Sequence, residues 1–118
     1  MPPTKINLNE AAATITHPWR PTTVAEVSGH AAKIAKFKGP FVWHQHDDAD
    51  EMFLCVEGIF RIEFRDGAVE LTPGDLITIP AGIEHRPVAD EEAVALLFEP
   101  QGLRNTGNVE HDELTAPR

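Results

Sequence analysis

The sequence predicts an all-β domain, an antiparallel barrel or sandwich of short strands with little helix. Apolar, strand-like runs follow one another at short intervals through the middle of the chain, and turn residues such as Asp66-Gly67 separate them. Helix signals are scarce, since only one helical turn is expected, over residues 10–13 with Asn9 as its cap. Short strands at this spacing are typical of a sandwich or a closed barrel.

Each predicted strand ends at a turn or at a change of polarity. The clearest pair is a hairpin through Asp66-Gly67, because residues 60–65 alternate apolar with charged side chains. The apolar side chains of this run are expected inside the barrel, and Arg61 and Arg65 outside it. In chain order, the predicted strands are residues 23–27, 31–39, 41–46, 51–58, 59–66, 68–74, 75–80 and 93–99.

A chain of 118 residues is long enough for one hydrophobic core but not for two. We expect an N-terminal segment (1–21), which could pair with a partner subunit, then the barrel (22–99) and an irregular polar tail (100–118). In the tail, polar side chains such as Asn105 and Asn108 could fold over the barrel mouth, but a loop packed on the barrel or on a partner is the favoured interpretation.

Composition excludes several classes of function. The formal charge is −9, from 10 Lys plus Arg against 19 Asp plus Glu, which disfavours nucleic-acid binding because phosphate recognition needs clustered cations. No stretch approaches the roughly 20 apolar residues that cross a bilayer, and the N-terminus has no apolar signal-peptide core. The single cysteine, Cys55, allows no intrachain disulfide. A cytoplasmic domain that binds neither nucleic acid nor membranes is expected.

The stretch WHQHDDADEMF, residues 43–53, carries the main chemical signal. Alternate side chains of a strand face the same way, so His44 and His46 share one face, roughly 7 Å apart. Glu51 opens the next predicted strand after an acidic turn, which is expected to be solvated, so a hairpin can return its carboxylate to the histidine pair. His85, after a separate turn, is the fourth candidate.

Three imidazoles and one carboxylate suit a divalent transition metal such as Fe, Mn, Ni or Zn, and the residues do not choose among these ions. Four ligands on an octahedral ion leave two positions open for a bidentate substrate, or for a substrate and dioxygen. The spacing therefore predicts one metal site made of His44, His46, Glu51 and His85.

The same residues resemble the first motif of the cupins, which reads Gly, five residues, His-x-His, three or four residues, Glu, six residues, Gly. The sequence supplies Gly39, His44, His46, Glu51 and Gly58 in that order. The glycine that opens the motif is one residue closer to the histidines than the pattern asks.

The second cupin motif reads Gly, five residues, Pro-x-Gly, two residues, His, three residues, Asn. Gly74, Pro80, Gly82 and His85 match it, whereas Ala89 stands in place of the final Asn. Neither departure touches a ligand. Two motifs in order, both on predicted strands, make this resemblance specific over about residues 22–99.

The resemblance implies a double Greek-key (jelly-roll) barrel of cupin type with one metal ion in its mouth, held by the four residues named above. The chain is most similar to small conserved-barrel cupins, several of which are labelled by likeness to mannose-6-phosphate isomerase. Fold does not fix function. A metal-dependent enzyme on a small molecule, of dioxygenase or isomerase type, is expected, and a non-catalytic barrel that binds or senses a small ligand is the alternative.

The pocket is expected to be apolar apart from its ligands. Val42, Phe53 and Cys55 fall on the faces of His44 and Glu51 and are candidates to line it, although Phe53 and Cys55 fit the barrel core better. No Arg or Lys is expected to face inward, which counts against a sugar-phosphate substrate. Small cupins are often homodimers, so the resemblance also implies a homodimer, with the N-terminal run KINL able to add a strand to a partner's sheet.

Overall fold

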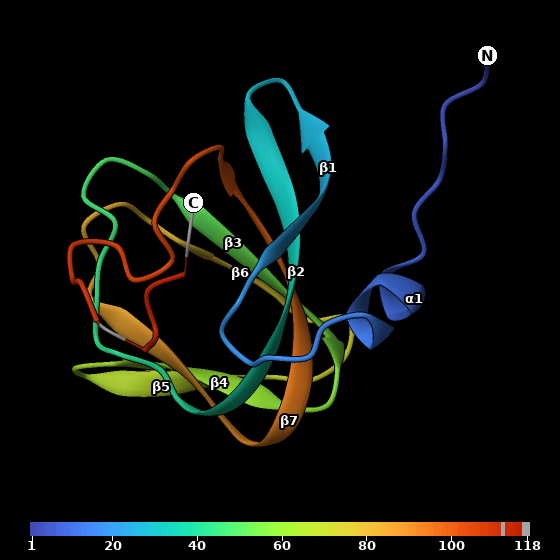
Figure 1. The fold of residues 1–118 in the computed structure, drawn as a ribbon. Helices are drawn as coiled ribbons and strands as arrows, with labels where there is room; N and C mark the ends of the chain where they lie inside the picture. Colours follow the sequence, from blue (N-terminus) through green and yellow to red (C-terminus); the bar gives the residue numbers. More distant parts are fainter. Residues whose placement is uncertain (112, 117–118) are drawn as a thin grey trace.

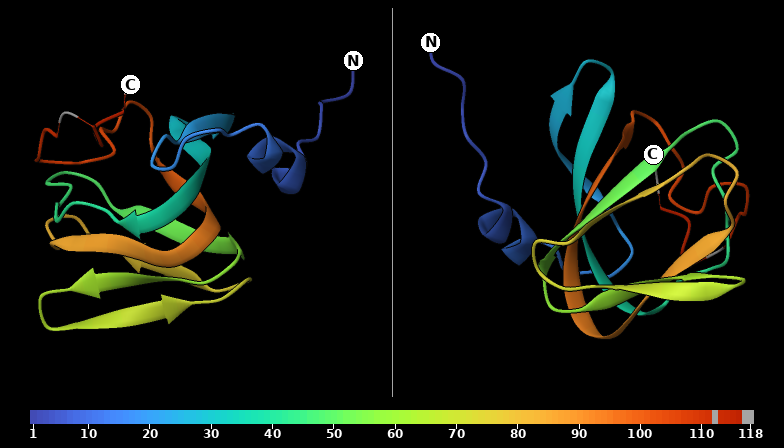
Figure 2. Two further views of the ribbon diagram at one scale, coloured as in Figure 1. Left: turned by 60° about the horizontal axis from the view of Figure 1, so that its bottom comes forward. Right: turned by 180° about the vertical axis from the view of Figure 1, so that it is seen from behind.

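Seven antiparallel strands and one short helix make up the part of the chain that the computed structural model describes, residues 1–111 and 113–116. The sheet curls on itself to form a barrel (Figures 1 and 2). The elements are α1 (Leu8–Ala13), β1 (Thr22–Val27), β2 (His30–Pro40), β3 (Glu51–Glu57), β4 (Phe60–Phe64), β5 (Gly67–Leu71), β6 (Leu76–Ile79) and β7 (His85–Pro100). The all-β prediction with little helix is therefore confirmed.

Strand β7 holds the barrel together because it belongs to both halves of the sheet. The main strand order is β1-β2-β7-β3-β6, while β4 pairs with β5 and also with β7. The first part of β7 lies beside β4, with Val88 opposite Arg61. Its second part lies beside β3, with Phe98 opposite Met52. The sequence predicts only residues 93–99 of this strand, because the acidic residues 90–92 interrupt the apolar pattern that would reveal its first half.

Aromatic side chains fill the barrel. Phe37 lies edge-on to Phe60, with ring centroids 5.1 Å apart, and Phe53 packs beside both. Trp19 stacks on Phe37, with ring centroids 4.6 Å apart, and donates its indole N–H to a backbone carbonyl. Ile62 is fully buried beneath these rings. The inner face predicted for the 60–65 run is confirmed.

The charged side chains of the same hairpin lie outside the barrel, as predicted. Arg61 Nε donates to Glu63 Oε2 at 2.8 Å, and Arg86 Nε donates to the other oxygen of Glu63 at 2.8 Å. The guanidinium carbon of Arg65 lies 3.9 Å from the centroid of the Trp43 ring. Ion pairs at this level of exposure contribute little to stability.

Residues 41–46, predicted as a strand, do not form one. Only His44 pairs, through an isolated bridge to His85. The next residue, Gln45, directs both of its backbone groups to Asn108 of the tail: the Gln45 N–H donates to Asn108 Oδ1 and the Gln45 carbonyl accepts from the Asn108 N–H. Because this backbone bonds to several different segments, no continuous ladder can form.

Helix α1 begins two residues earlier than predicted. Its cap is Asn7, not Asn9, and Asn7 Oδ1 accepts a hydrogen bond from the N–H of Glu10 at 2.9 Å. Starting at Leu8 allows one face of the helix to pack on the outer side of the sheet. Ala12 of the helix, and Ile15 just beyond its end, pack against Ile34 and Val94, and Leu8 joins this cluster.

Residues 1–7 are exposed, and they extend away from the barrel in all the views of Figures 1 and 2. Within the described residues, no helix has the length and apolar character to span a membrane.

Candidate metal centre

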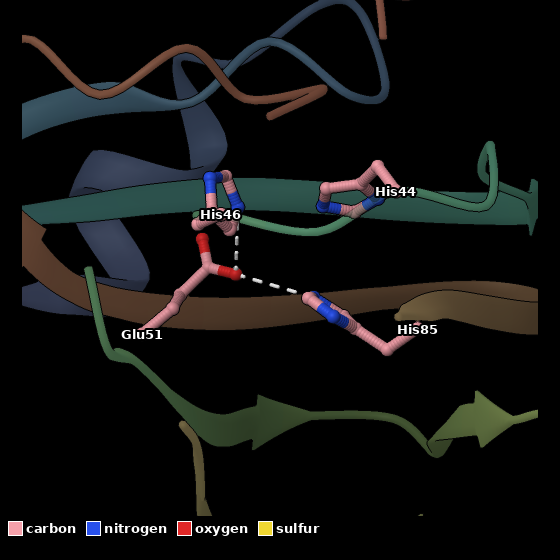
Figure 3. A group of neighbouring side chains, drawn as sticks. All are labelled: His44, His46, Glu51 and His85. Atoms are coloured by element: carbon pink, nitrogen blue, oxygen red, sulfur yellow. Dashed lines mark ion pairs between the residues drawn. The ribbon is translucent and has the colours of Figure 1, made fainter. Parts of the chain in front are cut away.

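Four side chains from three segments converge at one end of the barrel (Figure 3). His44 and His46 come from the 41–46 segment, Glu51 from the start of β3 and His85 from the start of β7. One ligand atom from each lies within 4.8 Å of the others. Glu51 Oε1 is 3.3 Å from His46 Nε2 and 3.5 Å from His85 Nε2. The structure thus brings together all four residues singled out from the sequence.

Backbone hydrogen bonds hold the two motifs against each other. The N–H of His44 donates to the carbonyl of His85 at 3.0 Å, and the N–H of His85 donates to the carbonyl of His44 at 2.8 Å. One turn away, the N–H of Gly82 donates to the carbonyl of His46 at 2.8 Å. The relative placement of the three imidazoles is therefore fixed by the main chain and not by side-chain packing alone.

Two of the rings are oriented by carbonyl groups close in sequence. Nδ1 of His44 lies 2.9 Å from the carbonyl oxygen of Val42, and Nδ1 of His85 lies 2.8 Å from that of Ile83. A carbonyl oxygen only accepts, so each Nδ1 carries the proton. Each Nε2 then presents a lone pair to the centre of the cluster, as in metal sites whose histidines are held in this way.

The cluster is buried, and burial controls its charge. His44 is 2% exposed, and burial, reinforced by the neighbouring His85, lowers its pKa to about 4. Burial alone would raise the pKa of Glu51, but the close approach of His46 and then His85 outweighs it and lowers this pKa to about 2. At neutral pH the site therefore contains an ionised carboxylate and a neutral His44, the protonation states that a metal ligand requires.

Four buried polar atoms of the cluster have no hydrogen-bond partners. These atoms are both ring nitrogens of His46, Glu51 Oε1 and His85 Nε2. The 3.3 and 3.5 Å separations are close contacts, but they are not aligned as hydrogen bonds. Such separations match the roughly 3.0–3.5 Å between neighbouring ligands of an ion bound at about 2.1 Å. A buried polar atom without a partner is costly, so the donor set fits a bound cation.

A small cavity of about 20 Å³ opens beside the cluster. His44 and Glu51 supply its polar side, and the remaining wall is mainly apolar. Of the three residues considered for the pocket, Phe53 lines this cavity, whereas Val42 packs against the core without lining it. This volume is about that of one water molecule or ion.

Cys55 lies deeper in the core and outside this cavity. Its Sγ is 3.3 Å from the carbonyl oxygen of Gly58, to which the thiol donates. Burial, together with the charge of Asp75, raises the pKa of the Cys55 thiol. A protonated, buried thiol is a poor nucleophile.

Two residues near the site were missed by sequence analysis, Glu99 and Lys33. Glu99, on β7, is 2% exposed, and its Oε1 lies 3.7 Å from Nζ of Lys33 on β2. Burial first, and then the charge of Glu51, raises the pKa of Glu99 to about 7. The expectation that no cation faces inward is corrected by Lys33, which lies on the same face of β2 as Ala35 and Phe37.

Alternation along residues 95–99 could have placed Glu99 beside the buried Ala95 and Leu97. That signal is ambiguous, since residues 93–97 are all apolar and do not reveal which face is inner.

The C-terminal tail packs over the histidine segment. Besides the Asn108–Gln45 pair, Asn105 donates from Nδ2 to the carbonyl of Trp19 at 3.2 Å. Gly107, with φ of +57°, lies so close to Gln45 that a Cβ would overlap the Gln45 carbonyl and approach the ring of His44 to 3.1 Å. Asn105 also lines the cavity at the cluster. The tail therefore covers the mouth of the barrel and buries the histidines.

Both departures from the cupin pattern fall at one place in the sheet. Gly39 lies opposite Ala89, next to a register shift at which residues 90–92 of β7 stand against the single residue Lys38 of β2. Ala89 is fully buried, and its methyl group requires no hydrogen-bond partner.

Comparison with known proteins also identifies a cupin domain in this chain. Residues 34–99, more than half of the chain, match the cupin domain family Cupin_2. The uncharacterized protein YdbB of Bacillus subtilis (strain 168) is 36% identical over 78 residues, which cover 65% of this chain and 69% of YdbB.

Solved structures give the same result. A cupin-2 domain containing protein from Shewanella frigidimarina NCIMB 400 is 40% identical over 81% of this chain and 94% of its own, with a TM-score of 0.80. Hydroquinone 1,2-dioxygenase of Sphingomonas sp. TTNP3 is 19% identical over 81% of this chain and 73% of its own, with a TM-score of 0.68, and this likeness establishes the fold alone. The chain therefore belongs to the cupin family.

Proposed function

We propose that this cupin binds one divalent transition metal ion through His44, His46, Glu51 and His85, and that it uses the ion to act on a small molecule. The observation that carries the proposal is the set of four buried donors within 4.8 Å of one another. Both ring nitrogens of His46, together with Glu51 Oε1 and His85 Nε2, are buried without a hydrogen-bond partner. Three imidazole nitrogens and one carboxylate oxygen are borderline ligands that suit Fe, Mn, Ni or Zn better than Ca or Mg.

An enzyme of dioxygenase or isomerase type agrees best with this ligand set. Four protein ligands leave room in the coordination sphere for a small molecule. A bound ion would supply redox chemistry if it is iron, or polarisation of a carbonyl if it is zinc, manganese or nickel. The apolar wall formed by Phe53 and its neighbours would exclude water from a bound ligand.

A mannose-6-phosphate isomerase activity is less well supported. A sugar phosphate needs a cationic clamp. Lys33 does face inward, but it is already paired with Glu99 at 3.7 Å.

Turnover separates an enzyme from a ligand-binding barrel. Oxygen consumption by the iron-loaded protein should be measured with 2,4-pentanedione and with cysteine, and isomerisation by the zinc- and manganese-loaded protein with glyceraldehyde. Metal-dependent product formation that is lost in Glu51→Gln supports the enzyme. If these compounds bind saturably and raise the unfolding temperature but are not converted, the non-catalytic alternative holds.

A further inference from the structure

We propose that Glu99, held in place by Lys33, is a ligand-binding group of this centre, and that it selects small molecules in which a hydrogen-bond donor stands next to a metal-binding oxygen. The inference rests on the proposed metal site and adds the chemical class of its ligand. Hydroxamates, α-hydroxy carbonyl compounds and vicinal diols belong to this class.

The position of Glu99 follows from the register of the sheet. Met52 on β3 lies opposite Phe98 on β7, so one further step along the antiparallel ladder places Glu51 beside Glu99. Both side chains are buried, so both point into the barrel. Neighbours across a ladder have Cβ atoms about 5 Å apart. A second carboxylate therefore stands next to the one proposed as a metal ligand.

Glu99 is not itself part of the four-residue cluster, and one of its oxygens is free. Oε1 faces Lys33, whereas Oε2 is buried and has no hydrogen-bond partner. A buried carboxylate oxygen without a donor is destabilising unless something supplies one. An N–H or O–H group of a ligand beside Glu51 would supply that donor.

Two cavities lie beside the neighbours of Glu99, although Glu99 itself lines neither. Its neighbour Glu51 lines the small cavity at the cluster, and its partner Lys33 lines a second cavity of about 210 Å³. Pro21 and Asn105 line both cavities, so the two adjoin.

Lys33 Nζ lies 3.7 Å from Glu99 Oε1 and restrains the Glu99 side chain, so we assign Lys33 a positioning role.

Two probes of almost equal shape test the inference. Acetohydroxamate and N-methylacetohydroxamate both chelate through two oxygens, but only the first keeps an N–H donor. Dissociation constants for both should be measured by absorption titration of the cobalt(II)-loaded protein. The variants are Glu99→Leu and the conservative Glu99→Gln, with the exposed Glu70→Gln as the matched control. Cobalt content is measured for each protein.

In the parent and in Glu70→Gln, acetohydroxamate should bind more tightly than its N-methyl analogue. This preference should fall about tenfold in Glu99→Leu, because a hydrogen bond to a charged group is lost, and by less in Glu99→Gln, which keeps an acceptor. Cobalt content should not change.

An unchanged preference in Glu99→Leu would overturn the inference while leaving the metal site intact. Loss of cobalt from both Glu99 variants would also overturn it, because Glu99 would then be a metal ligand. If the parent itself bound no cobalt, the proposed function would fail first, and the ligand class would fall with it.

Discussion

Glu51 and Glu99 are neighbouring buried carboxylates on β3 and β7, with opposite electrostatic surroundings. Burial alone would raise the pKa of both carboxyl groups, but the close approach of His46 and His85 lowers the pKa of Glu51 to about 2. Burial and the negative charge of Glu51 raise the pKa of Glu99 to about 7, because the opposing effects of Lys33 and His46 are weaker. One carboxylate is thus ionised throughout the physiological range, while the other titrates within it.

This difference predicts a pH-dependent stability. The pKa of Glu99 is about 7 in the folded protein and 4.5 ordinarily, so between these values the folded state binds more protons. The free energy of unfolding of the metal-free protein therefore loses the Glu99 contribution as pH rises from about 4.5 to about 7. Relative to the parent, Glu99→Gln should gain up to about 3 kcal/mol across this range.

Urea unfolding at pH 5, 6, 7 and 8, with a chelator present, measures this gain. Glu70→Gln serves as the control and should differ from the parent by the same small amount at every pH. A stability difference between Glu99→Gln and the parent that did not vary with pH would show that Glu99 titrates normally.

The tail should be coupled to the histidines through Gly107. Gly107→Ala combines a positive φ of +57° with overlap on the Gln45 carbonyl, and should cost about 2–4 kcal/mol. Gly102→Ala is the matched control, since Gly102 has φ of +77° but nothing within 4 Å of an added Cβ, and should cost only about 1 kcal/mol.

Metal affinity separates the two glycine variants further. Only Gly107→Ala should weaken metal binding, because its Cβ would press on His44. Equal affinity in the two variants would mean that the tail does not position the site. The free energy of unfolding is measured by urea unfolding, and the metal affinity by metal titration of the metal-free proteins.

A homodimer built on the N-terminal segment is a further prediction. Residues 1–7 are exposed and extend from the barrel, and Ile6 keeps 52% of its surface in solvent. Deletion of residues 1–7 should shift the sedimentation mass from about twice the 13.0 kDa chain mass to that of one chain. Substitution of the equally exposed Ile59 by Ser is the control. A full-length protein that sediments at one chain mass would refute the prediction.

The four candidate ligands were predictable because their spacing is local. His44, His46 and Glu51 lie within eight residues of one another, and His85 follows a turn marked by Pro80 and Gly82. The alternation predicted for His44 and His46 still holds although residues 41–46 are not a regular strand. The bridge from His44 to β7 keeps these alternate side chains on one side.

Glu99 was not predictable in the same way. Its importance depends on which residue of β3 it faces, and that pairing joins segments more than 40 residues apart. The irregularity of residues 41–46 has a similar origin, since Asn108 takes the hydrogen bonds that a strand neighbour would have used. The helix cap is Asn7 and not the predicted Asn9. Both asparagines can cap a helix, and packing on Ile34 favours the earlier start.

Metal content per chain tests the central claim most directly. Elemental analysis should be done on untagged protein prepared without chelators, beside His85→Ala and the matched control His17→Ala, which alters an exposed histidine. We expect close to one Fe, Mn, Ni or Zn ion per chain in the parent and in the control, and a sharp loss in His85→Ala. A parent that carries no metal and takes none up on incubation, or a His85→Ala variant that keeps a full complement, would contradict the account.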